Sequence, residues 1–335
     1  MSATVAIVGA TGAVGQVMLS VLEERDFPAS SIRLLASERS AGREVATSVG
    51  PVVVEDLAQA DPAGIDIALF SAGGERSLLH AGRFVEAGVV VIDNSSAWRM
   101  DPAVPLVVAG VNDHAVKNHH GLIANPNCTT MTLLMGVAPL HRAAGLHSMV
   151  VSSYQAVSGS GNKGVEELVH QAELLGKDVD LLRDGGWTDP VAQVYSRPIG
   201  WNVLPFAGNA VDGGYTDEEM KLVNESRKIL EAPDLEVQPT CVRVPVVAGH
   251  GSSATLRFDR PMEVAEALQL LDEADGVQVW SDQVPTPLDS AGIDDVLVGR
   301  VRPTLDVPGG INLWTVGDNL RKGAALNTVQ IAELL

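Results

Sequence analysis

Several features that would restrict the function are scarce in this sequence. Only two of its 335 residues are cysteines, Cys128 and Cys241, which is too few for a disulfide framework. Its apolar stretches, such as residues 104–111, are too short and too often interrupted by Pro or Gly to span a bilayer. The N-terminus lacks the basic region that opens a signal peptide. We therefore expect a cytoplasmic protein that does not bind membranes.

Basic residues are scarce as well. The chain has 23 Lys and Arg against 42 Asp and Glu, which gives a net charge of −19. Such a surface repels the phosphates of nucleic acids, so nucleic acid is not an expected partner. It does not forbid a small anionic substrate, because the cations of one site govern its binding. The length and a hydrophobic content of 46% are typical of a globular α/β protein with two domains.

A glycine-rich turn stands between the first predicted strand and the first predicted helix. The strand covers residues 4–8, the turn reads GATGAVG at residues 9–15, and the helix covers residues 14–24. Glycines in this place let the backbone approach a pyrophosphate, which sits on the helix N-terminus. The spacing G-x-x-G-x-x-G is weak alone, and a plain strand–helix turn is the alternative. We interpret the turn as a nucleotide site whose candidate contacts are Gly9, Thr11, Gly12, Ala13 and Val14.

The residues that follow the second predicted strand, at residues 32–36, distinguish between two nucleotide cofactors. An acidic residue after this strand binds the ribose hydroxyls of NAD, whereas an arginine accommodates the 2′-phosphate of NADP. Here Glu38 and Arg39 are adjacent and lie between Ser37 and Ser40. The arginine and its serines favour NADP(H), and a solvated loop charge is the alternative for Arg39.

Further strands are predicted at residues 65–70, 89–93, 107–111 and 122–124, with a helix at residues 76–87. Ligands lie at the carboxyl ends of parallel strands, so Ser71 is a candidate cofactor contact. Arg99 follows the strand at residues 89–93. The sequence leaves two interpretations of it equal, namely a clamp for a phosphate or carboxylate and an ordinary surface cation.

Cys128 follows a turn, Asn125-Pro126-Asn127, and precedes a run of apolar residues at helical spacing. This places the thiol in the first turn of a helix, with Asn127 as its N-cap. Backbone N–H groups and the helix dipole lower the pKa of a thiol there and favour the nucleophilic thiolate. The alternative is a small buried thiol.

The second half of the chain adds polar residues next to predicted strands and helices. Gln155 follows a strand predicted at residues 148–154 and opens a second glycine-rich turn. Glu218 and Lys221 share one face of a helix that begins after Thr216, and a solvated ion pair is their alternative. A strand around residues 240–246 carries Arg243. His250 follows it, and a structural, hydrogen-bonded histidine is the alternative there.

Together these segments resemble the aspartate-semialdehyde dehydrogenase family, nearly from end to end. The most specific are NPNCTT at residues 125–130 and CVRVP at residues 241–245, in this order and behind the glycine loop. The resemblance implies the NADPH-dependent reduction of L-aspartyl 4-phosphate to L-aspartate 4-semialdehyde with release of phosphate. This reaction is an early step toward lysine, threonine and methionine.

The resemblance also implies the roles of individual residues. Cys128 would form a thioester, and His250, with an ordinary pKa of about 6.5, would move the proton. Asn127 and the backbone N–H of Cys128 would face the oxyanion. The residues implied in substrate binding are Gln155 for orientation, Arg243 for the carboxylate, Glu218 for the ammonium, and Arg99 and Lys221 for the phosphate. Those implied on the nicotinamide side of the cofactor are Ser158, Gly159 and Asn319.

The fold implied by the resemblance is α/β with two domains. A doubly wound, Rossmann-type NADP-binding domain would comprise residues 1–127 and 319–335 and be closed by the C-terminal helix. An inserted α+β substrate and dimerisation domain would comprise residues 128–318, and the family implies a homodimer. No metal site is expected. One departure is Gly251, where members of the family often have Ser after the histidine.

Two other functions stay open. N-acetyl-γ-glutamyl-phosphate reductase also has a glycine loop, a cysteine and a histidine, but its acylated amine has no charge for Glu218 to meet. A non-enzymatic NADP-binding sensor of this fold would have an unreactive Cys128.

Overall fold

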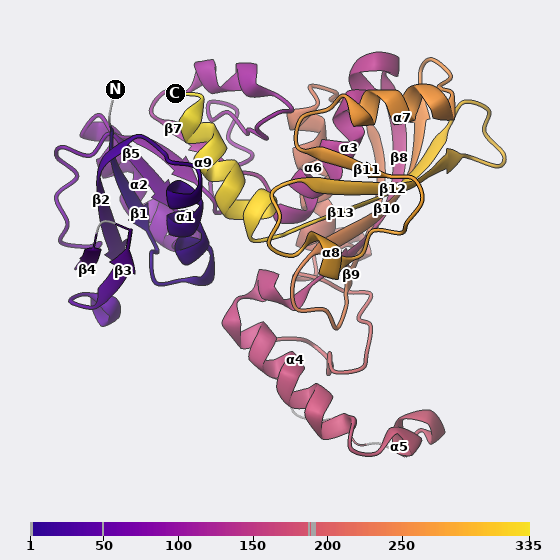
Figure 1. Ribbon diagram of the computed structural model, residues 1–335, viewed down its shortest axis with the longest axis horizontal. Coiled ribbons are helices and arrows are strands. Elements are labelled where there is room, and N and C mark those ends of the chain that lie inside the picture. Colours follow the sequence, from indigo (N-terminus) through magenta and orange to yellow (C-terminus); the bar gives the residue numbers. More distant parts are fainter. Residues whose placement is uncertain (1–2, 49, 187, 189–191) are drawn as a thin grey trace. The chain divides into compact units, whose positions relative to one another are not determined.

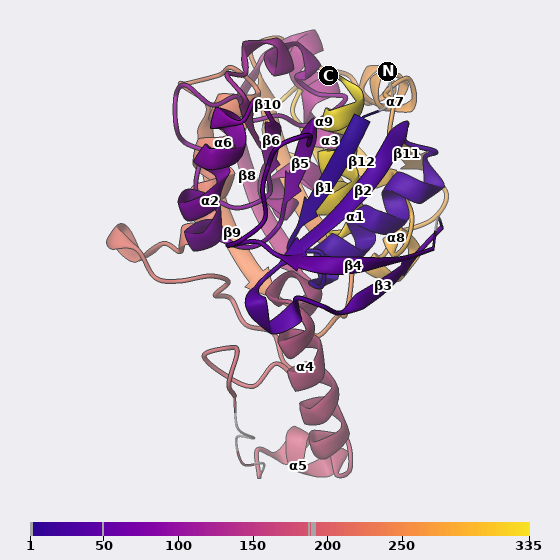
Figure 2. The ribbon, with the colours of Figure 1, turned by 90° about the vertical axis from the view of Figure 1, so that its left-hand side faces the viewer.

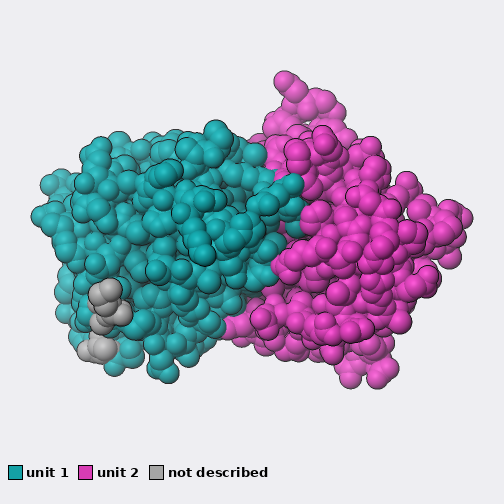
Figure 3. Space-filling view, turned by 90° about the horizontal axis from the view of Figure 1, so that it is seen from above, with its two compact units in different colours: residues 1–127, 228–231, 320–335 teal, residues 128–227, 232–319 magenta. Residues whose placement is uncertain are grey.

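The chain divides into two units (Figure 3). Each unit is built around its own sheet. Unit 1 comprises residues 1–127, 228–231 and 320–335, and unit 2 comprises residues 128–227 and 232–319. The structure, a computed structural model, describes residues 3–48, 50–186, 188 and 192–335.

Unit 1 contains a seven-stranded sheet in the order β3-β4-β2-β1-β5-β6-β7. Neighbouring strands are parallel, except that β3 is antiparallel to β4. The strands are β1 (Ala3–Val8), β2 (Ala29–Ala36), β3 (Glu44–Thr47), β4 (Gly50–Asp56), β5 (Ile67–Phe70), β6 (Val90–Asp93) and β7 (Leu122–Ala124).

Helices cover both faces of this sheet. On one face Ile7, Met18 and Val329 are buried in a core shared with α1 and α9. On the other face Phe70 of β5 packs edge to face against Phe84 of α2, with ring centroids 5.2 Å apart. This is a doubly wound fold, as predicted. The helical elements are α1 (Ala13–Glu24), α2 (Gly74–Glu86), α9 (Leu326–Glu333), the short 3₁₀ helices η1 (Glu38–Ser40) and η2 (Asp113–Asn118), and the π-helical turn η5 (Arg321–Ala325).

The strand predicted at residues 107–111 is wrong. An isolated bridge pairs Leu106 with Ala124, and residues 109–111 form a turn. Asn112 closes this turn, because its Oδ1 accepts the N–H of Val108 at 2.9 Å. Asn327 satisfies two more backbone groups of the same segment. Two asparagine side chains therefore do what a neighbouring strand would do for this apolar run.

Unit 2 contains a six-stranded mixed sheet in the order β11-β12-β13-β10-β8-β9. Strand β8 is parallel to β9 and β11 to β12, and the other neighbours are antiparallel. The strands are β8 (Leu146–Gln155), β9 (Glu236–Arg243), β10 (His250–Phe258), β11 (Val277–Trp280), β12 (Val296–Pro303) and β13 (Ile311–Gly317).

Helices α3 (Cys128–Ala144) and α7 (Val264–Asp272) lie on one face of this sheet (Figure 1). Glycines bring α3 close to β13. A Cβ on Gly136 would lie 2.7 Å from Thr315 Cγ2, and a Cβ on Gly317 would lie 2.9 Å from Thr132 Cγ2. The close approach holds α3, and with it Cys128 at its first position, against the sheet.

Unit 2 contains further helical elements. Helix α6 has the predicted capping box, because Thr216 N–H donates to Glu219 at 2.8 Å and Glu219 N–H donates to Thr216 Oγ1 at 3.3 Å. Helices α4 and α5 extend away from the sheet (Figure 2). The bounds are α4 (Asn162–Leu175), α5 (Val179–Asp184), α6 (Asp217–Ile229), α8 (Pro287–Ser290), η3 (Val157–Ser160) and η4 (Asp212–Gly214). Among the described residues, no helix is both long and apolar enough to cross a membrane.

Candidate active site

The glycine loop of unit 1 is held in place by close backbone contacts. Gly9 has a φ of +93°, and a Cβ there would lie 2.3 Å from the carbonyl oxygen of Ser71. A Cβ on Gly15 would lie 2.3 Å from the carbonyl oxygen of Gly9. Gly12 is the N-cap of α1 and offers no side-chain cap, and Ala13 and Val14 begin the helix. This arrangement fits a dinucleotide, whose phosphates need bare backbone at a helix N-terminus.

The predicted cofactor segment after β2 meets this glycine loop. Thr11 Oγ1 donates to Ser40 Oγ at 3.3 Å, which joins the glycine loop to η1 after β2. Ser37 is the N-cap of η1, and Arg39 on the same turn is exposed. The structure thus brings Gly9, Thr11, Ser40 and Ser71 together at the carboxyl ends of β1, β2 and β5.

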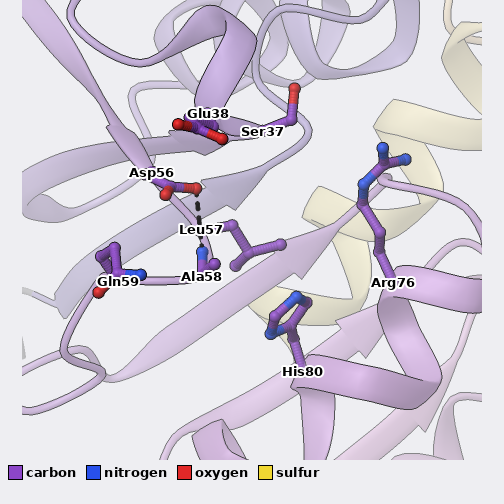
Figure 4. A pocket seen from close by; sticks show the side chains of 8 residues that line it. All are labelled: Ser37, Glu38, Asp56, Leu57, Ala58, Gln59, Arg76 and His80. Atoms are coloured by element: carbon purple, nitrogen blue, oxygen red, sulfur yellow. Dashed lines mark hydrogen bonds between the residues drawn. The ribbon is translucent and has the colours of Figure 1, made fainter.

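A pocket of about 400 Å³ lies at the same edge of the sheet in unit 1 (Figure 4). Arg76 and His80 point into it from α2, opposite Ser37 and Glu38 (Figure 4). Residues 56–59, which follow β4, line the remaining side. Sequence reasoning missed α2 and β4 here, because nothing in the local sequence says that their residues face η1.

Three of the predicted site residues of unit 2 lie at the ends of neighbouring strands. Gln155 ends β8 and is directly opposite Arg243, which ends β9. His250 begins β10 and is opposite Gly317, where a Cβ would face α3. Because paired residues share a face, Gln155, Arg243 and His250 all lie on the face that α3 covers. All three side chains are buried.

Arg243 is held by two groups and keeps one nitrogen available. Its Nη1 donates to the carbonyl oxygen of Ala156 at 2.7 Å, and its guanidinium lies 5.7 Å from the ring centroid of Tyr195. Its Nε is buried, and no acceptor among the described residues pairs with it. A buried donor of this kind calls for a ligand oxygen, as a carboxylate would supply. Sequence reasoning missed Tyr195, which no motif marks.

His250 differs from its prediction. Its Nδ1 accepts the N–H of Ala156 at 3.0 Å, so the neutral ring carries its hydrogen on Nε2. Burial, and next the charge of Arg243, lower the pKa of His250 to about 3. The near-neutral pKa expected from the sequence is therefore wrong. Nε2 is buried and has no partner among the described residues, and a Cβ on Gly159 would lie 3.4 Å from it.

Glu218 and Lys221 form the pair that their helical spacing predicts. Lys221 Nζ lies 2.6 Å from Glu218 and 3.2 Å from Asp217. The pair is not fully solvated, since 14% of the Glu218 side chain and 24% of the Lys221 side chain are exposed. Burial alone would lower the pKa of Lys221, but the two carboxylates outweigh it and raise that pKa. Lys221 is therefore a permanent cation at neutral pH.

Ser158 and Asn319 are joined within unit 2. Asn319 Nδ2 donates to Ser158 Oγ at 2.9 Å, and Asn319 Oδ1 accepts the N–H of Gly249 at 2.9 Å. Asn319 thus connects the turn that holds Ser158 and Gly159 to the segment just before His250. Its contact with the cofactor stays a prediction.

The two cysteines have different surroundings. Cys241 is buried, and burial raises its pKa to about 12, so its thiol is protonated and inert. Cys128 is partly exposed at the first position of α3. The buried-thiol alternative therefore describes Cys241 and not Cys128.

Arg99 and Asn127 belong to unit 1 and are both buried. Arg99 Nε donates to the carbonyl oxygen of Asn125 at 3.0 Å, and its Nη2 donates to that of Asn94 at 2.9 Å. The guanidinium therefore supports the segment after β6, and the surface-cation interpretation is wrong. Its phosphate role stays a prediction.

Gly251 has a physical reason to lack a side chain. A Cβ there would lie 2.3 Å from the ring of Trp314 on β13, which fills the space. The departure from Ser at this position thus goes with the neighbouring tryptophan.

Two family models match the chain. One, described as semialdehyde dehydrogenase, NAD binding domain, matches residues 4–119, and one described as semialdehyde dehydrogenase, dimerisation domain, matches residues 137–322. An aspartate-semialdehyde dehydrogenase of Streptomyces akiyoshiensis is 54% identical over 336 residues, covering 99% of this chain and 98% of the relative. The chain belongs to the aspartate-semialdehyde dehydrogenase family.

Other members of the family are similar over the same length. The aspartate-semialdehyde dehydrogenase of Bacillus subtilis is 44% identical over 99% of this chain and 96% of its own. A crystal structure of aspartate semialdehyde dehydrogenase II of Vibrio cholerae, complexed with ASA, has a TM-score of 0.94 and 44% identity. That match covers 100% of this chain and 98% of the other. The resemblance and the two-part α/β fold are thereby confirmed.

Proposed function

We propose that this chain catalyses the reversible, NADPH-dependent reduction of L-aspartyl 4-phosphate to L-aspartate 4-semialdehyde and phosphate. This is the early step toward lysine, threonine and methionine. Membership of the family supports the reaction. The observation that carries it in the structure is the row of Gln155, Arg243 and His250, on the sheet face that the Cys128 helix covers.

The substrate has a carboxylate, an ammonium and a phosphoryl group, and the chain has a residue of suitable charge for each. Arg243 would hold the carboxylate through its available Nε. Glu218 would hold the ammonium, and Lys221 and Arg99 would hold the phosphate. Gln155, whose Nε2 donates to Ser153 Oγ at 3.2 Å, would orient the reacting carbonyl.

Cys128 is the nucleophile in this mechanism. Its sulfur bonds to the acyl carbon, the bond from that carbon to the phosphate oxygen breaks, and phosphate leaves with the electron pair. The Asn127 amide and the backbone N–H of Cys128 would stabilise the oxyanion of the tetrahedral intermediate. The thioester on Cys128 is then reduced to a thiohemiacetal, which expels the aldehyde and restores the thiolate.

His250 would act on the substrate oxygen. Because Nδ1 is occupied by the Ala156 N–H, the neutral ring presents Nε2–H. This donor stabilises the negative charge that develops on the oxygen as the thioester is reduced. The low pKa keeps the ring in this neutral form at physiological pH.

Unit 1 would hold the cofactor, which supplies the hydride when bound. We infer NADP over NAD, because Ser37, Arg39 and Ser40 suit a 2′-phosphate. The pocket beside Arg76 is of a size for the adenine end. The remaining contacts in this proposal are Gly9, Thr11, Gly12, Ala13, Val14 and Ser71 in unit 1, and Ser158, Gly159 and Asn319 in unit 2.

We also propose that the enzyme is a homodimer associated through unit 2 and acts in the cytoplasm. The matched dimerisation model covers residues 137–322.

The test is an assay of NADP reduction with L-aspartate 4-semialdehyde, with and without phosphate. We expect NADPH formation that depends on phosphate and is much slower with NAD. Turnover of only the N-acetylated glutamate semialdehyde would assign the chain to the reductase of that substrate. No turnover of either aldehyde, together with an unreactive Cys128, would support the sensor.

A further inference from the structure

Strand β9 is an edge of the unit 2 sheet, so its outward N–H groups need partners from outside the sheet. The last three outward positions are Pro239, Cys241 and Arg243. Proline has no N–H, and the backbone N–H of Arg243 donates to the carbonyl oxygen of Leu204 at 2.8 Å. The N–H of Cys241 donates to Glu219 Oε1 at 3.0 Å. A side chain of α6 thus takes the place of a neighbouring strand.

The second carboxylate oxygen of Glu219 closes the start of α6. Oε2 accepts the N–H of Thr216 at 2.8 Å, and Glu219 N–H donates to Thr216 Oγ1 at 3.3 Å. Only 8% of Glu219 is exposed. One buried carboxylate therefore joins the first turn of α6 to the end of β9, whereas an ordinary capping residue serves its helix alone.

The two elements joined in this way carry the two halves of the proposed substrate clamp. Glu218, the ammonium ligand, precedes Glu219 on α6, and Lys221 follows it by two residues. Arg243, the carboxylate ligand, is two residues beyond Cys241 on β9. Both contacts of Glu219 are therefore within two residues of a clamp residue.

We infer that Glu219 is a positioning residue that fixes the spacing between the ammonium and carboxylate halves of the substrate clamp. This inference rests on the proposed function. Glu219 touches no substrate in this account. It acts by holding Glu218 and Arg243 at the separation that one amino acid spans, so that the two residues bind the ammonium and the carboxylate of the same substrate molecule together.

The direct test replaces Glu219 with Gln and compares Thr216→Ala. Glutamine has one acceptor oxygen, so at most one of the two N–H groups keeps its partner. We expect the KM for the semialdehyde to rise about tenfold, the order expected when a hydrogen bond to a charged group is lost. The kcat should change less, because Cys128 and His250 are on α3 and β10. Thr216→Ala removes the other half of the capping box and should leave this KM within about twofold.

Three further measurements separate the length of the Glu219 side chain from its charge and exclude misfolding. Glu219→Asp keeps the charge but is one methylene too short to bridge, so it should resemble Glu219→Gln. Hydrogen exchange should show lost protection at the amide of Cys241 or Thr216 in both Glu219 variants. The rate of Cys128 alkylation should match that of the wild type, which shows that the site is intact.

Three results would overturn the inference. They are an unchanged KM in Glu219→Gln, a full return to wild-type KM in Glu219→Asp, and an equal KM increase in Thr216→Ala. Absence of wild-type turnover with the semialdehyde would instead refute the proposed function, and the two failures are thus distinct.

Discussion

The glycine loop of unit 1 and the strand-end cluster of unit 2 form sites by opposite means. In unit 1 the site consists of backbone, and side chains at Gly9 and Gly15 would collide with carbonyl oxygens. In unit 2 it consists of buried side chains, and Arg243 and His250 each have a nitrogen with no partner among the described residues. A backbone site depends on missing side chains, whereas a side-chain site depends on the hydrogen bonds that orient its members.

The largest expected effect comes from replacing a glycine that faces backbone and comparing it with a glycine that faces a side chain. Gly15→Ala should cost about 3 kcal/mol of stability, because its Cβ meets backbone that cannot move aside. The atoms nearest to a Cβ on Gly251 belong to the ring of Trp314, so the cost of Gly251→Ala should largely vanish in a Trp314→Ala background. Urea unfolding of the single and double variants measures both. A Gly15→Ala cost below about 1 kcal/mol would contradict the backbone account.

Replacing Arg243 with Lys tests the side-chain site. Lysine keeps the charge but lacks the planar fork that serves Ala156 and a carboxylate together. The kcat/KM for the semialdehyde should fall about 100-fold, or roughly 2–3 kcal/mol, with the affinity for NADP unchanged. Steady-state kinetics and cofactor titration measure these two effects. A loss below threefold would mean that Arg243 does not hold the carboxylate.

Acid should destabilise the cluster through His250. Its folded pKa of about 3 is below the unfolded value of 6.5, so its contribution to stability is present above pH 6.5 and lost as pH falls. Between pH 6.5 and 4.5 the wild type should lose about 2 kcal/mol more than His250→Asn. Unfolding free energies at both pH values provide the check, and parallel losses would show that His250 is not held neutral.

The smallest expected effect concerns cofactor choice in unit 1. Arg39→Ala should raise the KM for NADP about tenfold and leave that for NAD unchanged, because only NADP has the 2′-phosphate. Arg43→Ala is the matched control, since Arg43 is also an exposed cation shortly after η1. Equal losses with both cofactors, or in both variants, would argue against a specific contact.

Local patterns were enough to predict the elements that carry the site. The glycine turn before α1, the helix that begins at Cys128 and the capping box of α6 follow from residues within a few positions of one another. The structure agrees with each of them.

Features that depend on distant residues could not be predicted. The apolar run at residues 107–111 resembles a strand until Asn327 is seen to bond its backbone. The pKa of His250 depends on burial and on the charge of Arg243. Only the order of the sheet, in which β8 lies between β9 and β10, brings these two residues near each other. The second contact of Glu219 needs the docking of α6 on β9. Each of these is a tertiary effect that leaves no local trace in the sequence.

The most direct test of the account is a single turnover without phosphate. Wild-type enzyme mixed with NADP and L-aspartate 4-semialdehyde should form one NADPH per active site and hold an acyl group on Cys128, identified by peptide mass spectrometry. Added phosphate should release that group, and Cys128→Ala should show neither burst nor adduct. An NADPH burst that persists in Cys128→Ala, or an adduct on another residue, would contradict the assignment of Cys128 as the nucleophile.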